Sequence, residues 1–185
     1  TYILTKKLVE HGEDVHVVEY NDITGGVFVV QKNLIKNLIG HKLHTLTSAN
    51  KKQELLTLIK KINPEICHLQ EFPEYWMPED LTREIYRDNR TYKIIETSHD
   101  SNPEARNWKR FLPDGFSFIS EFHPSMYKDL NVPYRIVEYP IENYTRPDRE
   151  KSLIDLGLDP KKYHVLNIGL WTSRKNQSEV VEVAR

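Results

Sequence analysis

The sequence has few of the residues that mark disulfide-rich, metal-binding or membrane-spanning proteins. Cys67 is the only cysteine among 185 residues, so neither an intramolecular disulfide nor a zinc cluster of cysteines can form. No apolar run approaches the roughly 20 residues that a membrane-spanning helix needs. We predict that Cys67 is a buried structural thiol, which suits a reducing, cytoplasmic compartment.

The chain also lacks an excess of one charge. Its 26 Lys and Arg residues are balanced by 27 Asp and Glu residues, and the lysines are scattered. A nucleic-acid partner usually requires a concentrated basic surface, so we expect none. A Walker loop, a nucleophile elbow, a Cys-x-x-Cys pair, a dinucleotide glycine signature and the H-E-x-x-H metal spacing are all absent. We therefore assign the histidines other than His99 to surface or packing roles and expect no metal.

Helical and strand patterns alternate along the chain. Capping residues and periodicity predict helices over 1–13, 48–64, 77–89, 123–130, 149–158 and 177–185. Short apolar runs predict strands over 14–20, 27–31, 65–71, 92–100, 115–122, 134–140 and 163–169. Gly12 should end the first helix, and Ser48 should cap the start of the second. This alternation predicts an α/β fold with a doubly wound, Rossmann-like parallel sheet.

A change of composition divides the chain into two predicted domains. The stretch "IENYTRPDREKS" is polar and contains Pro147, which is typical of a linker. We place a Rossmann-like domain at 1–143 and the linker with the beginning of a second domain at 144–185. Because a doubly wound domain normally opens with a strand, we expect the first strand to be missing. We also expect the second domain to be truncated.

Polar residues follow several of the predicted strands, where ligands bind in doubly wound folds. His99 and Asp100 follow one strand, Glu71 precedes them along the chain, and Glu121 follows the next. An imidazole at such a position can hydrogen-bond a substrate hydroxyl or act as a general acid or base, and a structural role is nearly as well supported. We take His99 as the catalytic candidate, with Asp100 and Glu121 on the acceptor side.

The loop "LWTSRKN" joins the last predicted strand to the last predicted helix. Free backbone N–H groups at a helix start favour a phosphate, and Arg174 and Lys175 add positive charge. Exposed basic pairs are common in proteins, so this loop alone does not decide between a phosphate site and a solvated surface.

The order of several phrases resembles the retaining glycosyltransferases of family four. "LVEHGEDVHVV" is similar to the family phrase L-x-x-x-G-H-x-V-x-V, with Glu13 replacing the histidine. "INPEICHLQE" resembles P-D-I-x-H-x-H, "KIIETSHD" resembles T-x-H-D, and "FSFISEFHPSMYKDL" resembles V-S-x-x-x-x-x-x-L. "RIVEYPIEN" lies where the family has V-I-P-N-G-V-D, and "GLWTSRKN" where it has G-R-L-x-x-x-K-G. The resemblance covers nearly the whole chain.

The resemblance implies a GT-B fold, in which two Rossmann-like domains face each other across a cleft. The acceptor would bind mainly to the first domain and a nucleotide-sugar donor mainly to the second. Sugar transfer would retain the anomeric configuration without an obligatory metal or other cofactor. Matched position by position, Lys175 would contact the donor diphosphate, Gly169 would let the backbone approach it, and His99 would lie at the transfer centre.

Two departures from the family pattern keep alternatives open. Leu170 replaces the arginine that follows the family glycine, and Arg174 is a candidate substitute. The family's later E-x7-E segment would lie beyond Arg185. The alternatives are a non-catalytic nucleotide- or sugar-binding relative and another doubly wound enzyme, such as a nucleotide-sugar epimerase or a dehydrogenase.

The implied partners are a nucleotide-sugar donor and a glycan, lipid-linked or protein acceptor. A lipid-linked acceptor would bring a cytoplasmic enzyme to the inner face of the membrane, although no basic amphipathic helix supports such an association. The donor nucleotide, its sugar and the acceptor are not fixed by these residues. We expect the 185-residue segment alone to have little transferase activity.

Overall fold

The computed structural model describes residues 1–22, 24, 28–100, 102, 104–139, 141, 145–169 and 176–183. The chain forms two compact units, Thr1–Glu142 and Asn143–Arg185. The first unit contains two parallel sheets, one of two strands and one of four. Each unit is described by itself below.

The first unit begins with a helix that ends where the sequence predicts. Helix α1 spans Tyr2–Glu10. Gly12 follows at φ +86°, a backbone angle that side-chain-bearing residues rarely adopt. Strand β1 (Val17–Glu19) and strand β2 (Leu43–Thr45) form the two-stranded sheet, with Val17 opposite Leu43. The sequence does not predict β2, which is only three residues long.

The strand predicted over 27–31 is wrong. Residues 28–39 form helix α2 (Phe28–Ile39), which the short 3-10 helix η1 (Gly40–Lys42) follows. The helix is favoured because Lys32, Ile35 and Ile39 share one face. Both isoleucines are buried, and the Lys32 ammonium lies 2.9 Å from a Glu19 carboxylate oxygen. This tertiary packing outweighs the strand propensity of the adjacent valines.

Helix α3 (Lys51–Ile62) starts at a different cap from the predicted one. The Asn50 side chain, and not that of Ser48, accepts the hydrogen bond from the Gln53 backbone N–H at 3.1 Å. Ser48 instead accepts a bond from the Asn50 N–H. Asn63 ends the helix in the left-handed conformation at φ 49°, one residue before Pro64.

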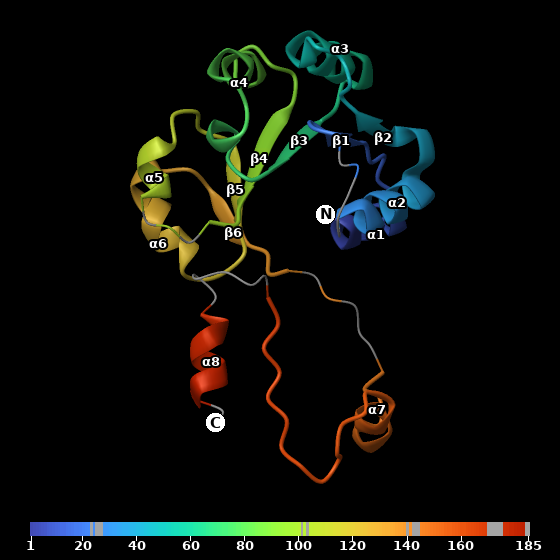
Figure 1. The fold of residues 1–185 in the computed structure, drawn as a ribbon. Coiled ribbons are helices and arrows are strands. Elements are labelled where there is room, and N and C mark those ends of the chain that lie inside the picture. The colour runs from blue at the N-terminus through green and yellow to red at the C-terminus, as the bar shows by residue number, and fades with distance from the viewer. Residues whose placement is uncertain are drawn as a thin grey trace. The chain divides into compact units, whose positions relative to one another are not determined.

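The four-stranded sheet has the order β3-β4-β5-β6 and is entirely parallel. Its strands are β3 (Ile66–Gln70), β4 (Lys93–Ser98), β5 (Gly115–Phe118) and β6 (Tyr134–Ile136). The connections contain η2 (Pro73–Tyr75), α4 (Glu79–Ile85), α5 (Ala105–Trp108), α6 (His123–Tyr127) and η3 (Lys128–Leu130). Figure 1 labels the three α-helices among them. The prediction of an α/β fold with a parallel, Rossmann-like sheet is confirmed.

Two buried clusters lie against this sheet. One is mainly aliphatic and includes Leu81 and Ile85 of α4 with Ile94 of β4. The other is aromatic and contains Phe72, Phe116, Phe118 and Tyr127. Ile94, Glu96 and Ser98 share one face of strand β4 and are all inaccessible to solvent, and Thr97 on the opposite face is also buried. Cys67 on β3 is only half-buried, and desolvation raises the pKa of its thiol to about 11.

The second unit contains helix α7 (Arg149–Asp155), capped by the Asp148 side chain, and helix α8 (Gln177–Val183). The strand predicted over 163–169 is wrong, because this run has no regular structure and its apolar side chains are exposed. A strand needs a neighbour for its backbone hydrogen bonds, and none of the described residues of this unit supplies one. Within the described part of the chain, no helix is long and apolar enough to cross a membrane.

Candidate functional site

Polar side chains gather where strands β3, β4 and β5 end. These strands are parallel neighbours, so their carboxyl ends share one edge of the sheet. Glu71 follows β3, and its backbone N–H donates to the Thr97 carbonyl oxygen at 2.8 Å. Its carboxylate accepts a 3.2 Å bond from the backbone N–H of His99, which follows β4. Glu71 therefore links the ends of the two strands.

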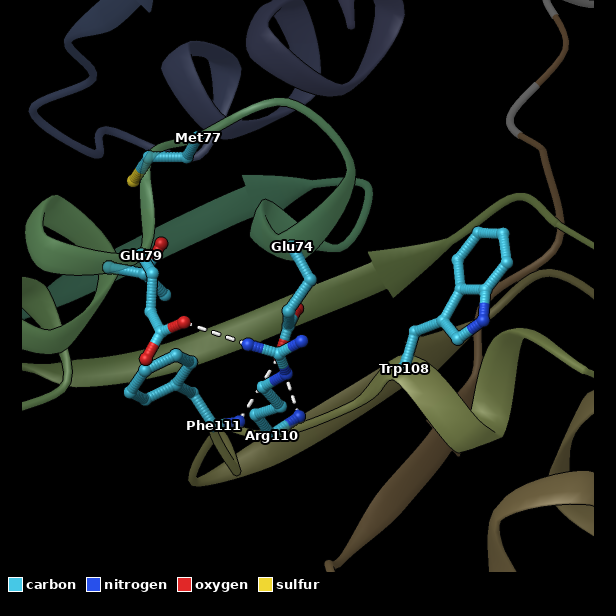
Figure 2. A pocket seen from close by; sticks show the side chains of 7 residues that line it. Glu74, Met77, Glu79, Trp108, Arg110 and Phe111 are labelled. Atoms are coloured by element: carbon cyan, nitrogen blue, oxygen red, sulfur yellow. Dashed lines mark hydrogen bonds and ion pairs between the residues drawn. The ribbon is translucent and has the colours of Figure 1, made fainter.

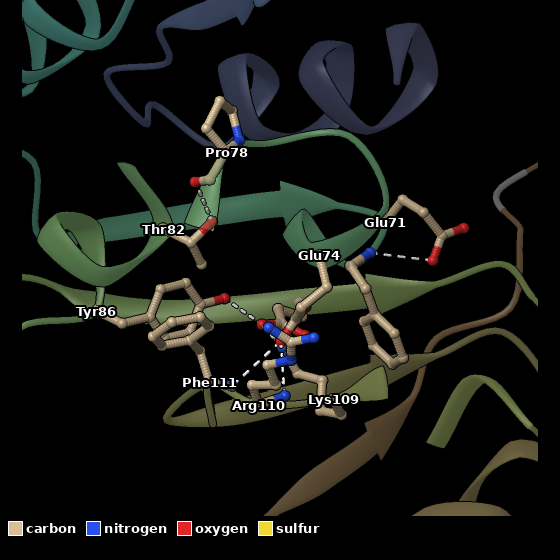
Figure 3. Close-up of polar contacts among 10 residues, drawn as sticks. Glu71, Glu74, Pro78, Thr82, Tyr86, Lys109, Arg110 and Phe111 are labelled. Atoms are coloured by element: carbon tan, nitrogen blue, oxygen red, sulfur yellow. Dashed lines mark hydrogen bonds and ion pairs between the residues drawn. The ribbon is translucent and has the colours of Figure 1, made fainter. Parts of the chain in front are cut away.

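The backbone of Glu71 is strained at this edge. Its φ is +97°, in the region that favours glycine. The second carboxylate oxygen turns back to accept the Phe72 N–H at 3.1 Å, as Figure 3 shows. A residue held in such a conformation costs about 1–3 kcal/mol and persists only when its surroundings fix it. Strain of this kind is concentrated at binding and catalytic sites.

Tyr139 holds the imidazole of His99. The His99 Nδ1 lies 2.6 Å from the Tyr139 hydroxyl oxygen, and the two rings stack with centroids 5.5 Å apart. Desolvation by burial lowers the pKa of His99, although nearby Glu71 opposes that shift. The imidazole is therefore neutral near pH 7. When Nε2 carries the proton, Nδ1 accepts a hydrogen bond from the Tyr139 hydroxyl, and the Nε2–H group can donate a hydrogen bond to a ligand oxygen.

The structure places Asp100 in the hydrogen-bonded network of this edge, whereas Glu121 takes no part in that network. The Tyr75 hydroxyl of η2 donates to an Asp100 carboxylate oxygen at 3.4 Å, and the Asn102 N–H donates to the other at 2.9 Å. Burial, and then the Asp100 charge, raise the pKa of Tyr75, so its phenol stays protonated. Glu121 is exposed in the turn before α6 and forms no hydrogen bond or ion pair with the described residues.

A buried histidine, which the sequence assigns to a surface or packing role, lies beside these residues. The His123 Nδ1 is 2.8 Å from the Ser120 hydroxyl, and the imidazole stacks on Phe118. Its Nε2 is buried without a hydrogen-bond partner among the described residues, as are the hydroxyls of Ser98 and Tyr127. The only sign of this arrangement in the sequence is that Ser120 lies three residues before His123. That spacing does not indicate that the histidine is buried.

A buried ionic network supports the loop that carries Tyr75. The Lys109 ammonium lies 3.0 Å from both carboxylate oxygens of Glu74 and 2.7 Å from a Glu96 oxygen, and the Tyr86 hydroxyl also donates to Glu96 (Figure 3). Desolvation raises the pKa of Glu96 to about 7, and Lys109 limits that rise. The network ties η2 and the segment after α5 to the centre of β4.

The donor-side candidates cannot be placed beside His99. Gly169 is exposed in the second unit. Arg174 and Lys175, together with Leu170, lie outside the described residues, so their roles stay predictions. Among the residues that the structure describes, no cluster of three or more His, Cys, Asp and Glu side chains could hold a metal ion.

The arrangement can act chemically as a hydrogen-bonding site in which the carboxylates of Glu71 and Asp100 are the charged groups. A neutral imidazole, a carboxylate and a phenol meet at the carboxyl edge, which suits recognition of a hydroxylated ligand. Comparison of the chain with protein-family models, curated proteins and solved structures gives no match.

Proposed function

We propose that the protein is a glycosyltransferase of GT-B type that transfers a sugar from a nucleotide-sugar donor to a hydroxyl acceptor with retention. The observation that carries this proposal is His99, a neutral imidazole held by Tyr139 at the carboxyl end of β4. Its segment is also the one that resembles the T-x-H-D phrase of family four. The division into two units and the parallel sheet of the first unit support the same reading.

In the proposed reaction, His99 recognises the sugar that is transferred. A neutral imidazole donates a hydrogen bond to a sugar hydroxyl. Because it carries no positive charge, it does not compete with the proposed basic residues for the donor diphosphate. Asp100, fixed by Tyr75, lies next along the chain and is a candidate to accept from a hydroxyl of the acceptor. A hydrogen bond of this kind that strengthens in the transition state contributes about 1–3 kcal/mol.

The proposed donor site supplies the positive charge for the leaving diphosphate. Lys175 and Arg174 are the candidates, and Gly169 would let the backbone approach the phosphates. Basic side chains can stabilise a departing diphosphate without a metal ion. Closure of the cleft between the domains would exclude water and so limit hydrolysis of the donor.

The test uses the full-length protein and a panel of UDP-, GDP- and ADP-sugars. Donor binding is measured by calorimetry and transfer by release of the nucleoside diphosphate. We expect Lys175→Ala to weaken donor binding and His99→Ala to lower kcat/KM by about 10- to 100-fold. Lys162→Ala and His41→Ala are matched controls, because both residues are exposed and outside the proposed site.

Two results would contradict these roles. Tight donor binding that Lys175→Ala leaves unchanged removes the phosphate assignment. Transfer that survives His99→Ala removes the role of His99 at the transfer centre. A protein that binds none of the sugar nucleotides and transfers nothing contradicts the proposed function as a whole.

A non-catalytic sugar- or nucleotide-binding protein is the second candidate. It is favoured by Leu170, which stands where family four has a diphosphate-binding arginine. The same experiment separates the two functions, because a binding protein retains a ligand without releasing nucleoside diphosphate. If the natural protein binds without transfer and Leu170→Arg gains transfer activity, Leu170 is the reason why the natural protein is inactive.

A further inference from the structure

A cavity in the first unit is lined by residues that neighbour the carboxyl-edge site in the chain. Its volume is about 390 Å³, within the range of small-ligand pockets. The side chains that matter for its chemistry are Glu74, Met77, Glu79, Trp108, Arg110 and Phe111. In Figure 2, Trp108 stands at one end of this set, and Glu79 and Phe111 stand at the other.

The cavity combines apolar surface with hydrogen-bonding groups. Trp108 is 53% exposed, unusually open for an indole, and Met77 and Phe111 add further apolar surface. At the other end, an Arg110 guanidinium nitrogen, Nη1, lies 2.7 Å from a Glu79 carboxylate oxygen. The other N–H groups of the Arg110 guanidinium form no hydrogen bond with the described residues, so most of its donors remain for a ligand.

The charges around the cavity balance. Glu79 pairs with Arg110 and also with Arg83, at 2.8 Å. Glu74 is neutralised by the buried Lys109. A site without net charge neither attracts phosphates nor favours a cationic ligand. The chemistry that fits is a neutral molecule with one apolar face and several hydroxyl groups.

The cavity walls are held in place by buried groups. Glu74 accepts hydrogen bonds from the backbone N–H groups of Arg110 and Phe111 at 2.9 and 3.1 Å. Lys109, between Trp108 and Arg110 in the chain, is inaccessible to solvent and bonded to Glu74 and Glu96. The segment that carries Trp108 and Arg110 is therefore fixed before a ligand arrives, which lowers the entropy cost of binding.

A chain of contacts joins the cavity to the candidate catalytic site. The Trp108 indole packs edge-on against the Tyr75 ring, with centroids 5.5 Å apart. The Tyr75 hydroxyl donates to Asp100, the residue after His99. Trp108, Tyr75 and Asp100 therefore form one chain of contacts between the cavity and the residue next to His99.

We propose that this cavity binds a sugar unit of a neutral oligosaccharide acceptor, next to the unit that receives the transferred sugar. Trp108 would stack on the apolar face of the pyranose, and Glu79 and Arg110 would bond its hydroxyls. The assignment of this sugar as part of the acceptor rests on the proposed glycosyltransferase function. It names the acceptor class as a glycan of at least two sugar units.

The test measures oligosaccharide binding without any donor, so that it does not depend on transfer. The probes are neutral disaccharides to tetrasaccharides of hexose and N-acetylhexosamine in α and β linkage, with the matching monosaccharides for comparison. Binding to the full chain is followed by calorimetry and ligand-observed NMR. We expect at least one oligosaccharide to bind with a Kd of about 1 mM or tighter, and more tightly than its monosaccharide.

Variants locate the binding. Trp108→Ala should weaken the oligosaccharide about tenfold or more, and Trp108→Phe, which keeps a stacking ring, should retain most of the affinity. Arg110→Met should weaken binding without removing it. Phe28→Ala is the matched control, because Phe28 is 62% exposed on α2 and does not line the cavity. Urea unfolding confirms that each variant is folded.

The outcomes separate this inference from the proposed function. If no oligosaccharide in the panel binds, or if Trp108→Ala binds as well as the wild type, the inference is wrong even when donor turnover is observed. If oligosaccharide binding depends on Trp108 and no sugar nucleotide is turned over, the cavity assignment stands and the glycosyltransferase proposal fails.

Discussion

Removing the buried ammonium of Lys109 should destabilise the first unit strongly. Lys109 and Glu96 have no exposed side-chain surface, and Glu74 has 9%. In Lys109→Met both carboxylates lose their shared cation while they stay buried. Breaking a buried ion pair by removing one partner costs about 3–5 kcal/mol, because the other charge is left uncompensated. We expect a loss of that size in the free energy of unfolding.

The assay is urea unfolding of the full chain, followed by circular dichroism at about pH 8 and about pH 5. The folded-state pKa of Glu96 already lies above its ordinary value of 4.5, at about 7, and loss of Lys109 raises it further. In the wild type the carboxyl group is therefore charged at the higher pH and neutral at the lower, and in Lys109→Met it takes up its proton at a higher pH. Because the unfavourable species is the charged one, the deficit of Lys109→Met should shrink as the pH falls.

Two further variants isolate the cause. Lys93→Met is the control, because its side chain is 75% exposed and its pair with Asp114 should contribute less than about 1 kcal/mol. Lys109→Met combined with Glu96→Leu should recover part of the loss. Two results would contradict this reasoning: Lys109→Met no less stable than Lys93→Met, or a loss of unfolding free energy that is the same at both pH values. Either result would show that Lys109 does not stabilise the fold by neutralising buried carboxylates.

Two smaller effects follow from the first unit. Burial, and next the nearby His16, lower the pKa of His44 below 6.5, so the unfolded chain binds this proton more tightly and stability falls as the pH drops below that value. His44→Gln should flatten the change in urea midpoint between about pH 7.5 and 5, and an unchanged slope would show that His44 is not responsible. Asn50→Ala should cost about 1 kcal/mol through loss of the α3 cap, measured by the same unfolding assay. A larger loss from Ser48→Ala would contradict that cap assignment.

Most of the parallel sheet could be predicted because its strands carry their own signals. The β4 run "KIIETS", for example, contains two adjacent isoleucines, a threonine and a serine, and it lies between helical patterns. The run over 27–31 failed because valines favour strands locally, whereas the burial of Ile35 and Ile39 requires a helix. The run over 163–169 failed for the opposite reason, since its strand pattern has no partner strand in the described residues.

The candidate site was predictable only as a set of positions. Because parallel strands end at one edge, the sequence indicated that His99 and Asp100 lie where ligands bind. It did not indicate that Tyr139, forty residues further along the chain, would hold the imidazole. Nor did it identify His123 as buried, because that burial depends on packing against Phe118 in the folded chain.

The sequence by itself determined the four strands of the larger parallel sheet and the residues at its carboxyl edge, because short-range periodicity and turn chemistry suffice for these. It did not determine α2, β2 or the run over 163–169. Only the tertiary structure decided which of the carboxyl-edge residues meet. The stacking of Tyr139 on His99, the strained Glu71 and the cavity beside Trp108 all join segments that are distant in the chain.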